Sequence, residues 1–308
     1  MSIGLAQKLM AIPFDRNFDA PYGQVVRVSP RIRRLLAPNP SLFTFKGTGV
    51  AIVGENEVAV IDPGPDDPEH LANLRAVLQG ETVTHILVTH THSDHSPAAR
   101  ALKEWTGAPT YGFGPHGRGP NEHGIAVEEG GDTDFVPDIA VHDGDMIVGA
   151  GFTMECVHTP GHTSNHICYA LKEEKALFSG DHVMAWSTTV VAPPDGDMVE
   201  YLASLRKLLA RDDAIYWPTH GGPVREPRSF VQAYLDHRLE REAQILEALG
   251  AGLTHIPDIV NRIYAGLDSF LKPAAGLSVL AHLLLLVKDG RAICSGPPGL
   301  KAQFRRKT

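Results

Sequence analysis

The chain has 308 residues, of which 43% are hydrophobic and 21% are charged, and its formal net charge is −8. This length allows one large domain and a smaller one. The negative net charge argues against a protein whose whole surface attracts nucleic acid. The three cysteines are widely spaced, so we expect free thiols in a reducing cytoplasm, without a disulfide framework or a cysteine metal site.

Two further expectations follow from the distribution of apolar residues. Residues 1–20 have no long apolar run and no cleavage-site pattern, so we expect no signal peptide. No stretch approaches the roughly 18 consecutive apolar residues of a membrane span, so we expect no membrane partner.

Residues 22–62 look like a β-meander. Apolar and polar residues alternate within its segments, and residues 54–57 fit a hairpin turn. The expected strands are residues 24–28, 48–53 and 58–62.

The next segments predict a helix, a strand and a second helix. Leucines at helical spacing and apolar runs of strand length identify them. Ser96 has the residue type of an N-cap, and Pro97 suits the first helical position. The expected ranges are 68–79 for the first helix, 85–89 for a buried strand and 97–105 for the second helix.

Residues 113–137 are rich in glycine, proline and acidic residues and show no periodicity, which predicts a long loop near the site. We expect its two histidines, His116 and His123, to be solvated. The acidic residues Glu128, Glu129, Asp132 and Asp134 would repel phosphate groups here.

Short apolar strands resume after this loop, and strands followed by helices occur twice along the chain. This order predicts two sheets faced with helices, an α+β fold of the four-layer αββα type. The loop from Asp195 to Met198 is expected to line the entrance of the site, or Asp197 simply caps the helix of this second half. The expected strands are 146–148, 152–157, 166–170, 176–179 and 214–217, and the expected helix is 198–210.

The character of the sequence changes near residue 236, which predicts a first domain over 1–235 and a second over 236–308. Three helices followed by a small hairpin resemble a winged helix-turn-helix. Thr254 is a possible cap of the middle helix. The expected helices are 241–249, 256–264 and 273–288, and the hairpin is expected over 290–299.

The densest group of potential metal ligands lies between the predicted strand at 85–89 and the helix after it. His90, His92, Asp94 and His95 place three imidazoles and a carboxylate within six residues. Neutral imidazole nitrogens and carboxylate oxygens suit zinc, and also iron or manganese. A polar loop that is histidine-rich by chance is the simpler alternative, but four such donors at one strand end favour a metal site.

Three later residues follow other predicted strands in the same way: His162, Asp181 and His220. Strand ends gather distant side chains at one edge of a sheet, so we expect these residues to join the first group. Seven donors are too many for one tetrahedral zinc ion, which takes four ligands. They divide naturally between two ions. We expect their neighbours His166 and His182 to pack without binding metal.

The arrangement His90-x-His92-x-Asp94-His95, followed by His162, Asp181 and His220, is similar to the metallo-β-lactamase superfamily. That resemblance implies two metal sites. The first would be held by His90, His92 and His162, and the second by Asp94, His95 and His220, with Asp181 bridging both.

Several features narrow the set of branches of this family that the chain resembles. Its antibiotic-hydrolysing enzymes typically have a cysteine at the position of Asp181, and its flavodiiron members usually have a glutamate at that of His92. The run Pro273 to Leu283 looks most like the endoribonuclease branch with a winged-helix tail. The segment Gly47 to Val50 departs from that branch, which more often has an asparagine and a tyrosine after the threonine.

By this resemblance the protein is a dinuclear zinc hydrolase in which two ions share a hydroxide. Asp94 would orient the hydroxide, and Asp181 would neutralise both cations. Asp62 either supports a ligand imidazole or simply caps a turn. The substrate is expected to be a small-molecule ester or thioester, with RNA as the alternative and a non-catalytic metal-binding or regulatory protein as a third possibility.

Charge separates these alternatives only weakly. Residues 237–308 contain ten Lys and Arg against six Asp and Glu, a net charge of +4, and the remainder has 18 against 30, a net charge of −12. A basic tail suits an RNA anchor. The leucine-rich face of 277–284 favours a tail that packs over the mouth of the site and shapes its pocket.

Overall fold

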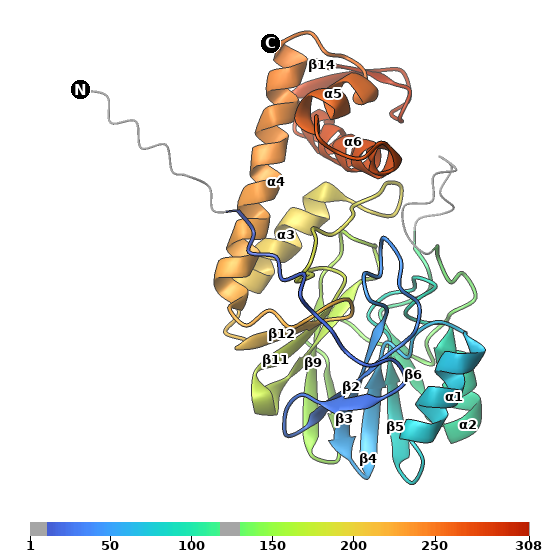
Figure 1. Cartoon of the computed structure of the whole chain (residues 1–308). Coiled ribbons are helices and arrows are strands. Elements are labelled where there is room, and N and C mark those ends of the chain that lie inside the picture. The colour runs from blue at the N-terminus through green and yellow to red at the C-terminus, as the bar shows by residue number, and fades with distance from the viewer. Residues whose placement is uncertain (1–10, 118–129, 308) are drawn as a thin grey trace.

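The computed structural model describes residues 11–117 and 130–307. His123, Glu128 and Glu129 therefore lie outside the described residues. Two β-sheets face each other in the first part of the chain, and the C-terminal part stacks on one end of it (Figure 1).

The first sheet has seven strands in the order β1-β2-β3-β4-β5-β6-β7. Its first four strands form the expected antiparallel meander, and β5 then runs parallel to β4. Strand β2 and the two short strands β6 and β7 have no counterpart in the sequence prediction. The strands are β1 Val25–Arg27, β2 Ile32–Leu36, β3 Gly49–Glu55, β4 Glu57–Ile61, β5 Thr82–Leu87, β6 Thr110–Gly112 and β7 Ile139–Ala140.

The second sheet has five strands in the order β12-β11-β10-β9-β8. Strand β12 runs parallel to β11, and the other neighbours are antiparallel. All five agree with the predicted strands to within two residues. They are β8 Met146–Gly149, β9 Phe152–His158, β10 Ile167–Leu171, β11 Ala176–Gly180 and β12 Ile215–Pro218.

Helices cover the outer face of each sheet and complete the predicted αββα layers (Figure 1). An apolar core that includes Phe152, Tyr169 and Trp217 fills the space between the sheets. The helices on the first sheet are α1 Pro68–Val77 and α2 Ala98–Thr106, and those on the second are α3 Met198–Leu209 and α4 Pro227–Gly250.

The helix starts follow the predicted caps in one case and not in another. Asp197 caps α3, because its side chain accepts hydrogen bonds from Val199 N and Glu200 N. The prediction for Ser96 was wrong: Pro97 occupies the N-cap position of α2 without a side-chain bond. The Ser96 hydroxyl instead donates to Asp132 Oδ2 over 2.7 Å, which ties the helix start to the loop beyond residue 130.

The C-terminal part consists of the second half of α4, two more helices and a hairpin. The proposed boundary at residues 235–236 falls inside α4, which is one continuous helix of 24 residues where only 241–249 had been predicted. Apolar residues of α4, α5 and α6 share one core with α3 and the second sheet, so this tail packs on the rest of the chain. The additional elements are α5 Ile256–Ile263, α6 Lys272–Lys288, β13 Ala292–Ser295 and β14 Gln303–Arg306.

Three expectations for this part were wrong in detail. The second strand of the wing is β14, and residues 297–299 lie in the connection before it. His255, not Thr254, is the N-cap residue of α5. An apolar segment of spanning length also exists: Ser269–Lys288 has a mean hydropathy of 1.8 over its most apolar window, of which 56% is buried in this structure. The core helix of a soluble protein has this composition too.

Candidate metal centre

Five segments that are distant in the sequence meet at one edge of the two sheets. Parallel pairing of β4 with β5, and of β11 with β12, places the carboxyl ends of these strands side by side. The residues just beyond the strands therefore converge. They are Asp62 after β4, His90 to His95 after β5, His162 after β9, Asp181 after β11 and His220 after β12.

The structure brings all seven predicted ligand residues together. They form three groups in which the candidate ligand atoms lie within 4.8 Å of one another. All seven side chains are buried. The groups are His90, His92 and His162; His90, His95 and Asp181; and Asp94, His95 and His220.

The carboxylates of Asp94 and Asp181 lie close to the candidate ligand imidazoles. Asp94 Oδ2 is 3.0 Å from His220 Nε2 and 3.3 Å from His95 Nε2. Asp181 Oδ2 is 3.3 Å from His220 Nε2, 3.6 Å from His95 Nε2 and 4.0 Å from His162 Nε2. Asp181 is thus the carboxylate that faces histidines of both predicted sites.

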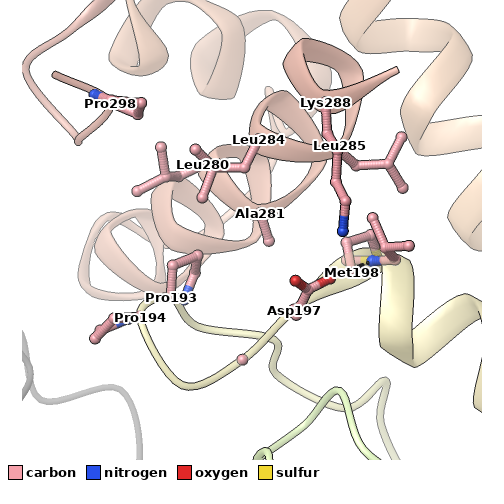
Figure 2. Close-up of a pocket in the computed structure, with 12 residues that line it drawn as sticks. Pro193, Pro194, Asp197, Met198, Leu280, Ala281, Leu284, Leu285, Lys288 and Pro298 are labelled. Carbon is pink, nitrogen blue, oxygen red and sulfur yellow. Dashed lines mark hydrogen bonds between the residues drawn. The ribbon is translucent and has the colours of Figure 1, made fainter. Parts of the chain in front are cut away.

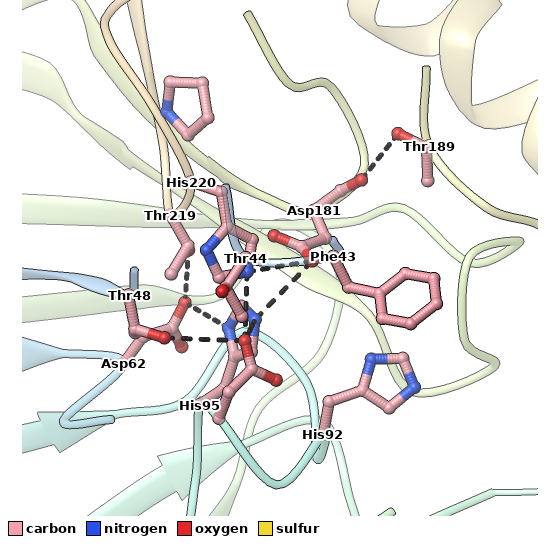
Figure 3. Close-up of polar contacts among 12 residues, drawn as sticks. Phe43, Thr44, Thr48, Asp62, His92, His95, Asp181, Thr189, Thr219 and His220 are labelled. Carbon is pink, nitrogen blue, oxygen red and sulfur yellow. Dashed lines mark hydrogen bonds and ion pairs between the residues drawn. The ribbon is translucent and has the colours of Figure 1, made fainter. Parts of the chain in front are cut away.

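Asp62 connects three of the converging segments, which favours its predicted supporting role over turn capping. Its carboxylate accepts hydrogen bonds from Thr89 N and Thr89 Oγ1, each over 2.8 Å, and from Thr219 Oγ1 over 2.7 Å. His95 Nδ1 lies 3.0 Å from its Oδ2 (Figure 3). A carboxylate that holds the outer nitrogen of an imidazole fixes the ring and its tautomer.

Backbone carbonyls hold two of the other rings in the same way. His162 Nδ1 lies 2.8 Å from Val190 O, and His220 Nδ1 lies 3.1 Å from Gly47 O. In both cases the Nδ1–H donates and Nε2 is left to face the carboxylates, which is the orientation that a metal ligand requires.

The donor set fits divalent metal ions. Burial alone would lower the pKa of His220, but Asp181 and Asp94 raise that pKa to about 10. Burial would likewise raise the pKa of Asp94, and His95 and His220 hold it below its usual range. Asp181 Oδ1 is buried without a hydrogen-bond partner among the described residues. Such a concentration of buried charge and open donor positions is what a bound cation would satisfy.

Two histidines next to the candidate ligands support the site without joining the three groups, as predicted. His166 Nε2 accepts a hydrogen bond from Asp181 N over 3.2 Å, while its Nδ1 lies 2.9 Å from Thr159 Oγ1. A Cβ at Gly180 would come within 2.5 Å of this His166 ring, so glycine is required there. His182 packs against the ring of Tyr201 at a centroid distance of 4.5 Å.

The sequence prediction missed two supporting residues. His116, expected to be solvated, is half-buried, and its Nδ1 lies 2.9 Å from Thr91 Oγ1, inside the histidine-rich segment. Arg34 on β2 is buried, and its guanidinium donates to Gly221 O, Pro218 O and Thr219 O over 2.9, 2.8 and 3.2 Å. No signal local to β2 predicts this role, because the contacts span more than 180 residues.

Arg34 also explains the unusual segment Gly47 to Val50. A Cβ at Gly49 would lie 2.0 Å from Arg34 Nη2 and 2.9 Å from Thr219 O. Gly49 therefore leaves space for the guanidinium beneath the His220 loop. The glycine at position 49, which departs from the endoribonuclease branch, therefore makes room for the arginine that holds the His220 loop.

Comparisons with known proteins agree with this architecture. The model of the Metallo-beta-lactamase superfamily matches residues 45–220, and that of the Beta-lactamase associated winged helix domain matches residues 256–296. A beta-lactamase-like protein 2 homolog of Drosophila melanogaster is 32% identical over 285 residues, which cover 87% of this chain and 91% of that protein. An atrochrysone carboxyl ACP thioesterase of Cryptosporiopsis sp. is 30% identical over 303 residues, covering 92% and 88%.

The crystal structure of a beta-lactamase domain protein from Burkholderia ambifaria has the same fold. It superposes with a TM-score of 0.79 at 20% sequence identity, covering 96% of this chain and 97% of that one. The family model covers more than half of the chain and includes all seven candidate ligands. This chain is a hydrolase of the metallo-β-lactamase superfamily with a C-terminal winged-helix domain.

Proposed function

We propose that this hydrolase binds two divalent ions, with zinc as the expected metal, and that it cleaves thioesters. The observation that carries the proposal is the placement of Asp181 between histidines of two donor groups. Relatives of 30% and 29% identity that are named as ACP thioesterases support the substrate class.

The residues divide between the two ions as the resemblance implies. His90, His92 and His162 would hold one ion, and Asp94, His95 and His220 the other, with Asp181 between them. Bound divalent ions supply an activated water and an electrophile for the carbonyl oxygen. No serine or cysteine nucleophile is required.

Asp94 is placed to orient the attacking water. The polar contacts that described residues make with Asp94 all use Oδ2, including a long one of 3.5 Å from Thr48 Oγ1. This leaves Oδ1 to accept the proton of the water. In the overall reaction the water oxygen bonds to the carbonyl carbon, the C–S bond breaks, and the thiol leaves with a proton.

The surroundings of the site favour an acyl substrate over RNA. Phe45 stacks on Trp186 with a centroid distance of 4.8 Å and an interplanar angle of 10°. Asp132 lies against the histidine-rich segment, because its backbone N–H donates to Thr91 O, and Asp134 follows two residues later in the chain. Aromatic and acidic neighbours suit an apolar acyl group at the metal centre better than phosphodiesters.

The test is metal content and turnover of the purified full chain. We expect close to two zinc ions per chain, hydrolysis of a thioester such as acetyl-N-acetylcysteamine, and little hydrolysis of a generic phosphodiester. Asp181→Ala should lose at least one ion and nearly all activity, because its carboxylate neutralises both cations. Asp212→Ala, an exposed carboxylate paired with Lys175, is the matched control.

Three outcomes would contradict the proposal. Absence of metal even after reconstitution would leave a binding or regulatory protein. Normal turnover of Asp181→Ala would remove this residue from the site. Efficient phosphodiester cleavage without thioester cleavage would favour the nuclease alternative.

A further inference from the structure

A cavity of about 380 Å³ lies between the winged-helix domain and the loop that leads into α3 (Figure 2). Pro193, Pro194 and Met198 line it from the catalytic domain, and Leu280 and Leu284 line it from α6. Cavities of roughly 300–1,000 Å³ are the usual size of small-molecule sites. The winged-helix domain thus contributes one wall of this cavity.

The cavity is mainly apolar but carries one available cation. Leucine, methionine, alanine and proline side chains form most of the lining, and the side chain of Lys288 extends along it toward Met198 (Figure 2). The Lys288 side chain is exposed, and the nearby carboxylate of Asp289 pairs with Arg291 instead. The carboxylate of Asp197, which also lines the cavity, accepts two backbone N–H groups at the start of α3. An apolar wall with one ammonium group suits an apolar chain that ends in an anion.

The segment that lines one side of this cavity also contacts the proposed metal centre. Val190 O holds His162 Nδ1 at 2.8 Å. Further along the same loop, Asp197 N donates to Gly161 O over 3.0 Å. The segment 190–197 therefore contacts the His162 loop and contributes Pro193, Pro194 and Asp197 to the lining of the cavity. The cavity and the His162 loop therefore share this one segment of chain.

We propose that the cavity binds the acyl chain of the substrate, and that this chain is apolar and ends in a carboxylate that pairs with Lys288. The inference rests on the proposed thioesterase function and specifies its substrate class. The chain would lie against Leu280 and Leu284, and the thioester carbonyl would lie at the metal centre. Burial of each methylene contributes about fourfold to kcat/KM, so chain length should dominate specificity. The exposed Lys288 should contribute roughly fivefold at most.

The experiment compares three N-acetylcysteamine thioesters: acetyl, decanoyl and 9-carboxynonanoyl. Wild-type kcat/KM should be at least tenfold higher for both long chains than for acetyl, and a few-fold higher again with the terminal carboxylate. Leu284→Trp fills the cavity and should lower kcat/KM at least tenfold for both long chains while leaving acetyl unchanged. Lys288→Glu should abolish only the preference for the carboxylate.

Equal effects of Leu284→Trp on acetyl and long-chain substrates, with normal metal content, would overturn the proposal. If Leu284→Trp melts at a lower temperature than the wild type, the experiment uses Val199→Trp instead, which fills the cavity from the opposite wall. If no thioester is hydrolysed, the proposed function fails, and the cavity is tested by calorimetric binding of decanedioate. Binding that Leu284→Trp abolishes would support the cavity as an acyl site, and no binding to wild type would refute it.

Discussion

Asp62 shows how one residue outside the predicted ligand set organises the centre. Its carboxylate receives hydrogen bonds from Thr89 and Thr219 and holds His95. Loss of such a supporting partner typically costs about 10- to 100-fold in metal affinity. We expect Asp62→Asn to lower zinc affinity by this factor, because the amide presents a donor where the carboxylate accepts several bonds.

Chelator competition with the full chain measures this change. The exposed neighbour Asp66 provides the control variant Asp66→Asn, which should bind zinc like the wild type. Unchanged affinity in Asp62→Asn would reduce Asp62 to a turn-forming residue.

At the residue scale the sequence predicted the convergence of the ligands and a supporting role for Asp62, and it missed two other supporting residues. The seven candidate ligands could be found because their residue types are rare in such density and each follows an apolar strand. His116 and Arg34 could not, because one lies in an aperiodic loop and the other in a strand with no distinctive pattern. Their roles depend on contacts with Thr91 and with the His220 loop, which only the fold creates.

At the scale of elements, strand β2 holds the His220 loop in place through the hydrogen bonds of Arg34. Arg34→Met would leave the buried carbonyls of Pro218, Thr219 and Gly221 without this donor. Each unsatisfied buried group costs about 1–3 kcal/mol. We expect a lower melting temperature and weaker zinc binding, with partial recovery of both in Arg34→Lys.

Arg33→Met is the matched control, since Arg33 is the next residue of the strand and pairs with Glu81 instead. It should leave zinc affinity unchanged. Equal zinc affinity in Arg34→Met and wild type would limit Arg34 to a role in folding.

The strands and helices that the sequence missed share a physical reason. Strands β6 and β7 have only three and two residues, too few to show a period. Helix α4 packs on α3 and also on α5, α6 and β14, so its buried face changes along its length. A single apolar stripe, the usual signal of a helix, is therefore lost.

At the scale of the whole molecule, a buried histidine at the junction of the two domains should make the protein acid-sensitive. His282 on α6 is buried, and neither ring nitrogen has a hydrogen-bond partner among the described residues. Burial lowers its pKa to about 3, helped by Arg238, His237 and Arg241. The unfolded imidazole has a pKa of about 6.5. Stability is therefore fully present above about pH 6.5 and falls as the pH decreases toward 3, because only the unfolded chain takes up the proton.

We expect His282→Leu to flatten this pH dependence by up to about 1.4 kcal/mol per pH unit. Urea unfolding of metal-free protein at pH 7.5, 6 and 5 measures the effect. His142→Leu is the control, since that side chain is 69% exposed. Parallel pH profiles for wild type and His282→Leu would show that this imidazole is protonated or accessible in the folded state.

The basic C-terminal region is the remaining argument for RNA, and its structure weakens that argument. Of its ten Lys and Arg residues, Arg238 is buried, Arg262 pairs with Glu247, and Arg291 pairs with Glu242 and Asp289. The densest run, Arg305 to Lys307, lies at the end of the chain. An RNA anchor that contacts 6–10 phosphates would lose roughly 10³- to 10⁵-fold in affinity between 50 and 200 mM salt. We expect instead a loss below about tenfold for the full chain, measured by fluorescence anisotropy with a single-stranded RNA.

Replacing Arg305, Arg306 and Lys307 by alanine should remove most of the residual binding and leave thioester hydrolysis unchanged. A steep salt dependence that survives this triple replacement would instead favour a structured RNA-binding surface, and with it the endoribonuclease alternative.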